Sequence, residues 1–279
     1  MSLFDEIIKA IEEEIEKCNY YTGMISSLPT KVKGTMNKFN QDTRGLEHEK
    51  GIVITDKGET VMERDDGDEF SVNVPWSGIP YEILKAHIGL NVDHNHPLQQ
   101  GFEGFATCLS EADIYHLAQL RPKNLDSNLK PLKDENGHYE YEFVYKSVSA
   151  EGGNGSRMTL SIVDEDKFRA FAYENGDINP KFRRGIKHFC GENGTYSRFL
   201  RGSRQETTEH MKEWGTDYLK QARKKDKENL SLTSFLKGVH DERMNYQKEY
   251  CQDYMEYALS NDVRFFNSIG LELSFGWVK

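Results

Sequence analysis

The sequence lacks the cysteine pairs from which disulfide frameworks and zinc knuckles are built. Its four cysteines are far apart and none belongs to a CxxC pair; they are Cys18, Cys108, Cys190 and Cys251. Nothing in this spacing resembles a disulfide-stabilised secreted module or a cysteine-based zinc module.

Long apolar runs are also absent, since none approaches the roughly 20 residues that are needed to cross a bilayer. The first residues, MSLFDEIIKAIEEEIEK, carry acids where a secretory signal needs a basic start and an apolar centre. We therefore expect no membrane partner and a cytoplasmic location, where cysteines stay reduced.

The chain has no excess of positive charge, because 36 Lys and Arg stand against 46 Asp and Glu, a net charge of -10. Proteins that bind nucleic acid along an extended surface usually show a basic face, so the composition disfavours nucleic acid as a partner. The hydrophobic fraction of 37% is typical of a folded chain. A length of 279 residues allows one large domain or two small ones.

Short strand and helix patterns alternate in the N-terminal half. Helical spacing covers residues 2–20, whereas the segment 28–44 fits no clear pattern. The remaining predicted elements here are strands at Gly51–Thr55, Thr60–Glu63, Phe70–Val74 and Gly89–His94, and helices at Ile79–Ile88 and Ser110–Leu120. This order predicts an α/β fold with a mixed β-sheet flanked by helices.

The C-terminal half changes character along its length. Two β-rich runs, Tyr139–Val148 and Arg157–Val163, are joined by EGGNGS, a composition typical of a hairpin tip. Long amphipathic helical patterns follow at Thr207–Ala222 and Ser231–Leu259. We predict a domain over 1–164 and a helical C-terminal region over 165–279, with the alternative that these helices pack on the sheet. The helical region could bind a protein partner.

The most informative segment is VDHNHP at 92–97, followed by SEAD at 110–113. Side chains two apart on a strand share a face, so His94 and His96 can direct both imidazoles to one point. Two neutral imidazoles and a carboxylate form a common ligand set for catalytic zinc, and Asp113 would supply the carboxylate. The predicted cofactor is therefore Zn²⁺.

Hydrolysis at such a metal also needs a base that is not itself a ligand. Glu47 and Glu49, just before the first core strand, are the two candidates, and Ser110 could stabilise a developing oxyanion. Each residue has a plainer interpretation: HxH pairs recur by chance, and Ser110 with Asp113 forms a good helix N-cap. The two interpretations of Asp113 are compatible.

The order Glu, HxHP, SxxD resembles the JAMM (JAB, MPN-plus) metallohydrolase family over roughly residues 45–165, and HNHP is similar to its RadC-type and phage-associated branches. The resemblance implies a JAMM/cytidine-deaminase-like sandwich with His94, His96 and Asp113 as zinc ligands. It also implies assistance by Ser110 and a general base at Glu49, with Glu47 as the rival. The implied activity is cleavage of a peptide or isopeptide bond, with a protein or peptide substrate such as a ubiquitin-like conjugate.

The sequence departs from the family pattern where LQQGFEGFATCL separates HxHP from the serine. This insertion is either a substrate lid, with Gly101 and Phe102 near the metal, or an ordinary surface loop. Cys108 as a fourth ligand would make the site structural, and His116 is a candidate neighbour of the ligands.

Two other functions remain open. VDHNHP with the following glycines faintly resembles the HNH endonucleases, although the paired cysteines that often accompany that motif are missing. Alternatively, the domain is a catalytically inactive JAMM-like scaffold that serves in assembly. The intact ligand set favours the hydrolase.

Overall fold

The computed structural model describes most of the sheet-forming part of the chain and pieces of the later helices. The described residues are 28–67, 72–97, 109–152, 155–190, 205–217, 220, 237–243, 245–247, 249 and 259–277. The helix predicted over 2–20 and the inserted segment 98–108 lie outside these residues.

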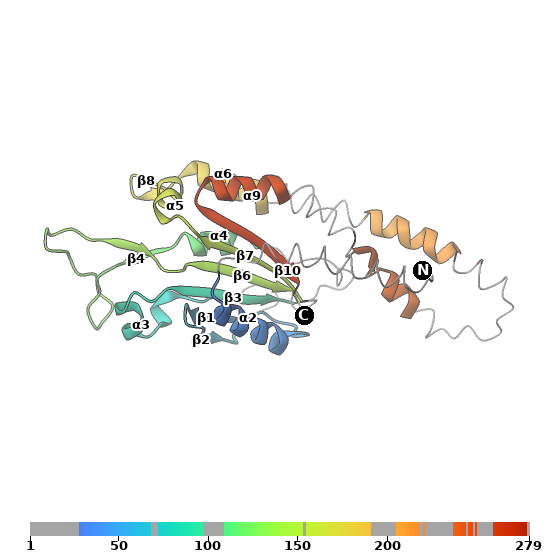
Figure 1. The fold of residues 1–279 in the computed structure, drawn as a ribbon, viewed down its shortest axis with the longest axis horizontal. Helices are drawn as coiled ribbons and strands as arrows, with labels where there is room; N and C mark the ends of the chain where they lie inside the picture. The colour runs from blue at the N-terminus through green and yellow to red at the C-terminus, as the bar shows by residue number, and fades with distance from the viewer. Residues whose placement is uncertain are drawn as a thin grey trace, which may run out of the picture.

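A six-stranded mixed sheet forms the centre of the fold (Figure 1). Its strands are β1 (Gly51–Thr55), β2 (Thr60–Arg64), β3 (Leu90–His96), β6 (Ser147–Gly152), β7 (Ser156–Ile162) and β10 (Leu271–Trp277), in the order β10-β7-β6-β3-β1-β2. Only the central pair β3–β6 is parallel, and the other neighbours are antiparallel. The predicted α/β class with a mixed sheet and flanking helices is confirmed.

Helices cover both faces of this sheet. The helix α2 (Thr30–Thr43) lies on one face, and α4 (Glu111–Leu117), α5 (Glu165–Ala172), α6 (Pro180–Cys190) and α9 (Leu259–Ser268) lie on the other (Figure 1). The short α3 (Tyr81–Lys85) follows a 3-10 turn at Trp76–Gly78. Of the helices that the structure describes, none combines the length and apolar character of a membrane span.

The near-continuous apolar strand β1 is explained by burial on both sides. Val53 belongs to the larger core, together with residues of α4, α5, α6 and α9. Ile52 and Ile54 point the other way and join a smaller core with Met36 of α2. The segment 28–44, which fitted no clear pattern, thus forms the helix that closes this second face.

Several predicted boundaries were wrong. The helix expected over Ser110–Leu120 ends at Leu117, because Leu120 begins β4 (Leu120–Pro122), which pairs with β5 (Tyr141–Phe143). The run Tyr139–Val148 is therefore divided between two sheets, and the helix expected over Ile79–Ile88 covers only α3. Of the strand expected at Phe70–Val74, the described residues 72–74 belong to no strand.

The last strand, β10, lies in the region that was expected to be helical. It pairs with β7 from Leu271↔Ile162 to Trp277↔Ser156, and Phe266 of α9 is buried in the larger core. A second small hairpin, β8 (Tyr173–Glu174) with β9 (Asp177–Ile178), links α5 to α6. The sheet and its larger core therefore extend across the predicted boundary at residue 164, and α5, α6 and α9 pack on the sheet.

The turn into β10 provides a test of this architecture. Gly270 has φ +84°, and a Cβ there would lie 2.5 Å from the Asp164 carbonyl oxygen. We expect Gly270→Ala to lower the free energy of unfolding by about 2–4 kcal/mol, from steric strain and an unfavourable backbone conformation. Gly176→Ala, also at positive φ but with open space around its Cβ, should cost only about 1 kcal/mol. Urea denaturation measures both, and equal losses would contradict a tightly docked β10.

Candidate metal centre

The candidate centre lies at the carboxyl end of β3. On this strand Leu90, Val92, His94 and His96 face the larger core, and the residues between them face α2. The parallel neighbour β6 places Ala150 and Gly152 opposite His94 and His96. Because these two residues are small, they leave room for a pair of imidazole rings.

The two imidazoles converge as the sequence predicted. Their Nε2 atoms are 3.0 Å apart, and the ring centroids are 4.8 Å apart at an interplanar angle of 69°. The His94 side chain is 6% exposed and that of His96 is 26% exposed. One ring is therefore buried at the base of the site and the other is accessible from outside.

Asp113 reaches the same point from the first turn of α4. Its Oδ2 accepts a hydrogen bond of 2.6 Å from the Ser110 backbone N–H, and its own N–H donates to Ser110 Oγ at 3.2 Å. This is a complete capping box. The other carboxylate oxygen, Oδ1, lies 3.3 Å from His94 Nε2. The helix-capping and site roles of Asp113 thus use different oxygen atoms.

Of the two candidate bases, Glu49 lies at the site. It is 6% exposed, and its Oε1 is 3.8 Å from His96 Nε2. The ligand atoms of Glu49, His94 and His96 all lie within 4.8 Å of one another, so this group could hold a metal ion. Glu47, two residues earlier, is exposed.

Asn95 is a site residue that the sequence analysis missed. It points away from the imidazoles, yet its Oδ1 accepts from the Lys50 N–H at 2.6 Å and its Nδ2 donates to the His48 carbonyl at 3.1 Å. Its backbone N–H also donates to the Lys50 carbonyl, at 3.1 Å. These bonds hold the backbone on both sides of Glu49 against the end of β3. The position of Asn95 between His94 and His96 was the feature of the sequence that could have indicated this role.

Two of the separations between donor atoms are close to those around a tetrahedral ion. Zinc bonds of ~2.0–2.1 Å place neighbouring ligand atoms roughly 3.3 Å apart. The His94–His96 and His94–Asp113 separations of 3.0 and 3.3 Å are close to that value. Glu49 Oε1 stands farther from its nearest imidazole nitrogen, at 3.8 Å from His96 Nε2.

The charges at the site also suit a cation. Burial, together with the neighbouring His94, lowers the pKa of His96 to about 4, so that this ring is neutral at pH 7. Burial alone would raise the pKa of Asp113, but His94, His96 and the Ser110 donors outweigh it and lower that pKa. A neutral imidazole beside an ionised carboxylate is the protonation state that metal binding needs.

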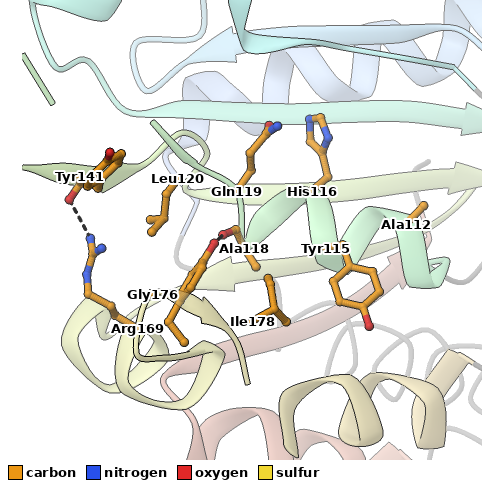
Figure 2. A pocket seen from close by; sticks show the side chains of 11 residues that line it. Ala112, Tyr115, His116, Ala118, Gln119, Leu120, Tyr141, Arg169, Gly176 and Ile178 are labelled. Atoms are coloured by element: carbon orange, nitrogen blue, oxygen red, sulfur yellow. Dashed lines mark hydrogen bonds between the residues drawn. The ribbon is translucent and has the colours of Figure 1, made fainter. Parts of the chain in front are cut away.

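A separate pocket of about 1130 Å³ runs beside α4 (Figure 2). Tyr115, His116 and Arg169 are among its lining residues, whereas Glu49 and the two strand histidines are not. His116 stacks on Tyr145, with 4.6 Å between ring centroids, and burial lowers its pKa. The structure therefore gives His116 a packing role. The proposed lid residues Gly101 and Phe102, and Cys108, lie outside the described residues.

Comparisons with known proteins returned no match to this chain among family models, curated proteins or solved structures.

The depressed pKa of His96 makes the metal-free protein sensitive to acid. The unfolded chain takes a proton on this ring near pH 6.5, but the folded protein does so only near pH 4. Between these values the unfolded state binds more protons, so the free energy of unfolding falls as the pH is lowered through this window. Urea denaturation with a chelator present should show ~1–3 kcal/mol less stability near pH 4.5 than near pH 7. The loss should be smaller in His96→Gln, and an equal loss in both proteins would contradict the assignment.

Proposed function

We propose that this protein is a zinc-dependent hydrolase of the JAMM type, with the metal held by His94, His96 and Asp113. The observation that carries the proposal is the position of His94 Nε2, which lies 3.0 Å from His96 Nε2 and 3.3 Å from Asp113 Oδ1. Both imidazoles come from one strand, and the carboxylate comes from the capped first turn of α4. Such a set leaves a fourth coordination position free.

When bound, zinc would supply a Lewis acid and an activated water. Glu49 is the residue that takes up and delivers the proton, because it stands beside His96 without the short spacing of a ligand. The hydrogen bonds of Asn95 to the backbone of His48 and Lys50 hold Glu49 at its distance from His96. The Ser110 hydroxyl lies beside Asp113, where it could donate to a developing oxyanion in place of the carboxylate.

The proposed reaction is hydrolysis of a peptide or isopeptide bond. The order of Glu49, the HNHP segment and the SEAD segment, which resembles the JAMM signature, supports this choice. The burial of Glu49 and its contact with His96 add to that support, since the same three parts of the chain meet in space.

Metal content tests the ligand set directly. We expect purified protein, equilibrated with zinc and then dialysed, to retain about one ion per chain by elemental analysis. His96→Ala and Asp113→Asn should each lose it, because either change removes one donor of three. His138→Ala, at an exposed position away from the site, is the matched control and should keep its zinc. A His96→Ala protein that still binds zinc stoichiometrically would refute the site.

A second test separates the base from the ligands. We expect Glu49→Gln to keep its zinc while turnover of quenched peptide or isopeptide reporters falls by about a hundredfold or more, as for loss of a general base. Glu47→Gln, a matched change at an exposed position, should retain activity. If Glu49→Gln loses the metal, then the ligand set is Glu49, His94 and His96. If Glu47→Gln alone loses turnover, then the base is misassigned.

A further inference from the structure

The helix α6 presents a uniformly basic surface. Apart from Pro180, every exposed residue of this 11-residue helix is Lys, Arg or His. These residues are Lys181, Arg183, Arg184, Lys187 and His188. The opposite side carries Phe182, Ile186 and Phe189, all buried in the larger core. Packing therefore accounts for the apolar side alone, and we call the five exposed residues the α6 basic face.

Four of the five residues of the α6 basic face form no ion pair with the residues that the structure describes. No ion pair among those described residues includes Lys181, Arg183, Arg184 or Lys187. Other exposed cations of the described residues do pair with acids, as in Arg64–Asp66, Lys123–Glu140 and Lys146–Glu165. A cluster of unneutralised cations is unusual in a chain whose net charge is -10.

The arrangement also has a cost to the helix itself. Lys181 and Arg183 lie in the first turn of α6, and that turn contains no acid. Positive charges at a helix N-terminus oppose the helix dipole and destabilise it by about 0.3–1 kcal/mol each. Lys187 and His188, in the last turn, are favoured by the same dipole, so the cost falls on the first turn. A locally unfavourable feature of this kind is typical of a functional surface.

The α6 basic face adjoins the candidate metal centre. The Cys190 thiol, at the end of α6, contacts the Leu109 carbonyl at 3.1 Å, and Leu109 immediately precedes Ser110. Near the other end, Phe182 packs edge-on against Tyr115 of α4, with ring centroids 6.1 Å apart. The helix therefore runs alongside the element that holds Asp113, and its last turn ends next to the proposed site.

We propose that the α6 basic face binds an acidic peptide segment, rich in Asp and Glu, of the protein that is cleaved at the metal centre. Eleven residues of helix span only about 16 Å, which suits a short extended peptide. A nucleic-acid duplex would extend beyond the patch over a surface that is acidic on balance, and would be repelled there. The role of the bound segment as substrate rests on the proposed function, whereas the binding itself does not.

The test uses a fluorescein-labelled hexaglutamate peptide and the full-length protein at low salt. We expect saturable binding by fluorescence anisotropy that weakens as salt is added. In the triple variant Lys181→Glu, Arg184→Glu, Lys187→Glu the dissociation constant should rise by about tenfold or more. An acid at position 181, near the start of α6, favours the helix dipole and offsets the acid that Lys187→Glu places in the last turn, so this variant should fold normally.

A charge-matched control lies on the other face of the sheet. Lys31→Glu, Lys33→Glu and Lys38→Glu on α2 change the net charge equally and should shift the dissociation constant by less than about twofold. An equal loss in both variants would overturn the proposal, because only net charge would then matter. Tight binding of a duplex oligonucleotide without hexaglutamate binding would also overturn it.

His96→Ala separates this proposal from the proposed function. It should bind hexaglutamate as the wild type does, because the α6 basic face does not include the metal ligands. If the wild-type protein binds no zinc but still binds hexaglutamate through α6, then the hydrolase proposal fails and the acidic-peptide surface stands. If zinc binds and hexaglutamate does not, then the surface proposal fails alone.

Discussion

The site depends on one constraint: β3 is buried on both faces although most of its residues are polar. Each polar side chain on such a strand needs a partner, because a buried group without one costs free energy. Ser147 donates to Asn91 Oδ1 at 2.7 Å, and Asn95 bonds the backbone on either side of Glu49. His94 and His96 meet each other and the carboxylates of Asp113 and Glu49. The candidate metal centre is where these polar groups gather at the end of the strand.

The face of the sheet toward α2 also carries a buried acid. Asp93 is fully buried there, and burial together with repulsion from Glu151 raises its pKa well above the ordinary value. Glu151 in turn pairs with Arg157. A negative charge is therefore disfavoured on the side chain that lies behind the imidazoles, whereas the pKa of Asp113, on the side of the imidazoles, is lowered.

Local sequence patterns predicted the HxH and SxxD segments of the site. The strand β10 and the end of α4 depend on pairing between distant strands, which local patterns do not reveal. The HxH spacing and the SxxD cap fix their side chains within a few residues, so both could be predicted from the sequence. Glu49 was favoured over Glu47 from the sequence because it lies two residues before Gly51, and the pairing of Asn95 with His48 and Lys50 holds it at the site. The strand β10 was missed because its partner β7 is more than a hundred positions away. The end of α4 is likewise set by pairing, since β4 needs β5.

The first turns of α4 and α6 carry charges of opposite sign. The helix dipole favours the acids of α4 and disfavours the first-turn cations of α6. In α4 the acids Glu111 and Asp113 stand where the helix dipole favours negative charge, so the capping role of Asp113 would explain its presence without any metal. Only the second oxygen of Asp113, directed to His94, indicates more than a cap. In α6 the charges in the first turn, on Lys181 and Arg183, have the unfavourable sign, whereas Lys187 and His188 in the last turn are favoured by the dipole. Because the dipole cannot account for the first-turn charges, they are the stronger support for the proposal that an anionic segment binds beside the site.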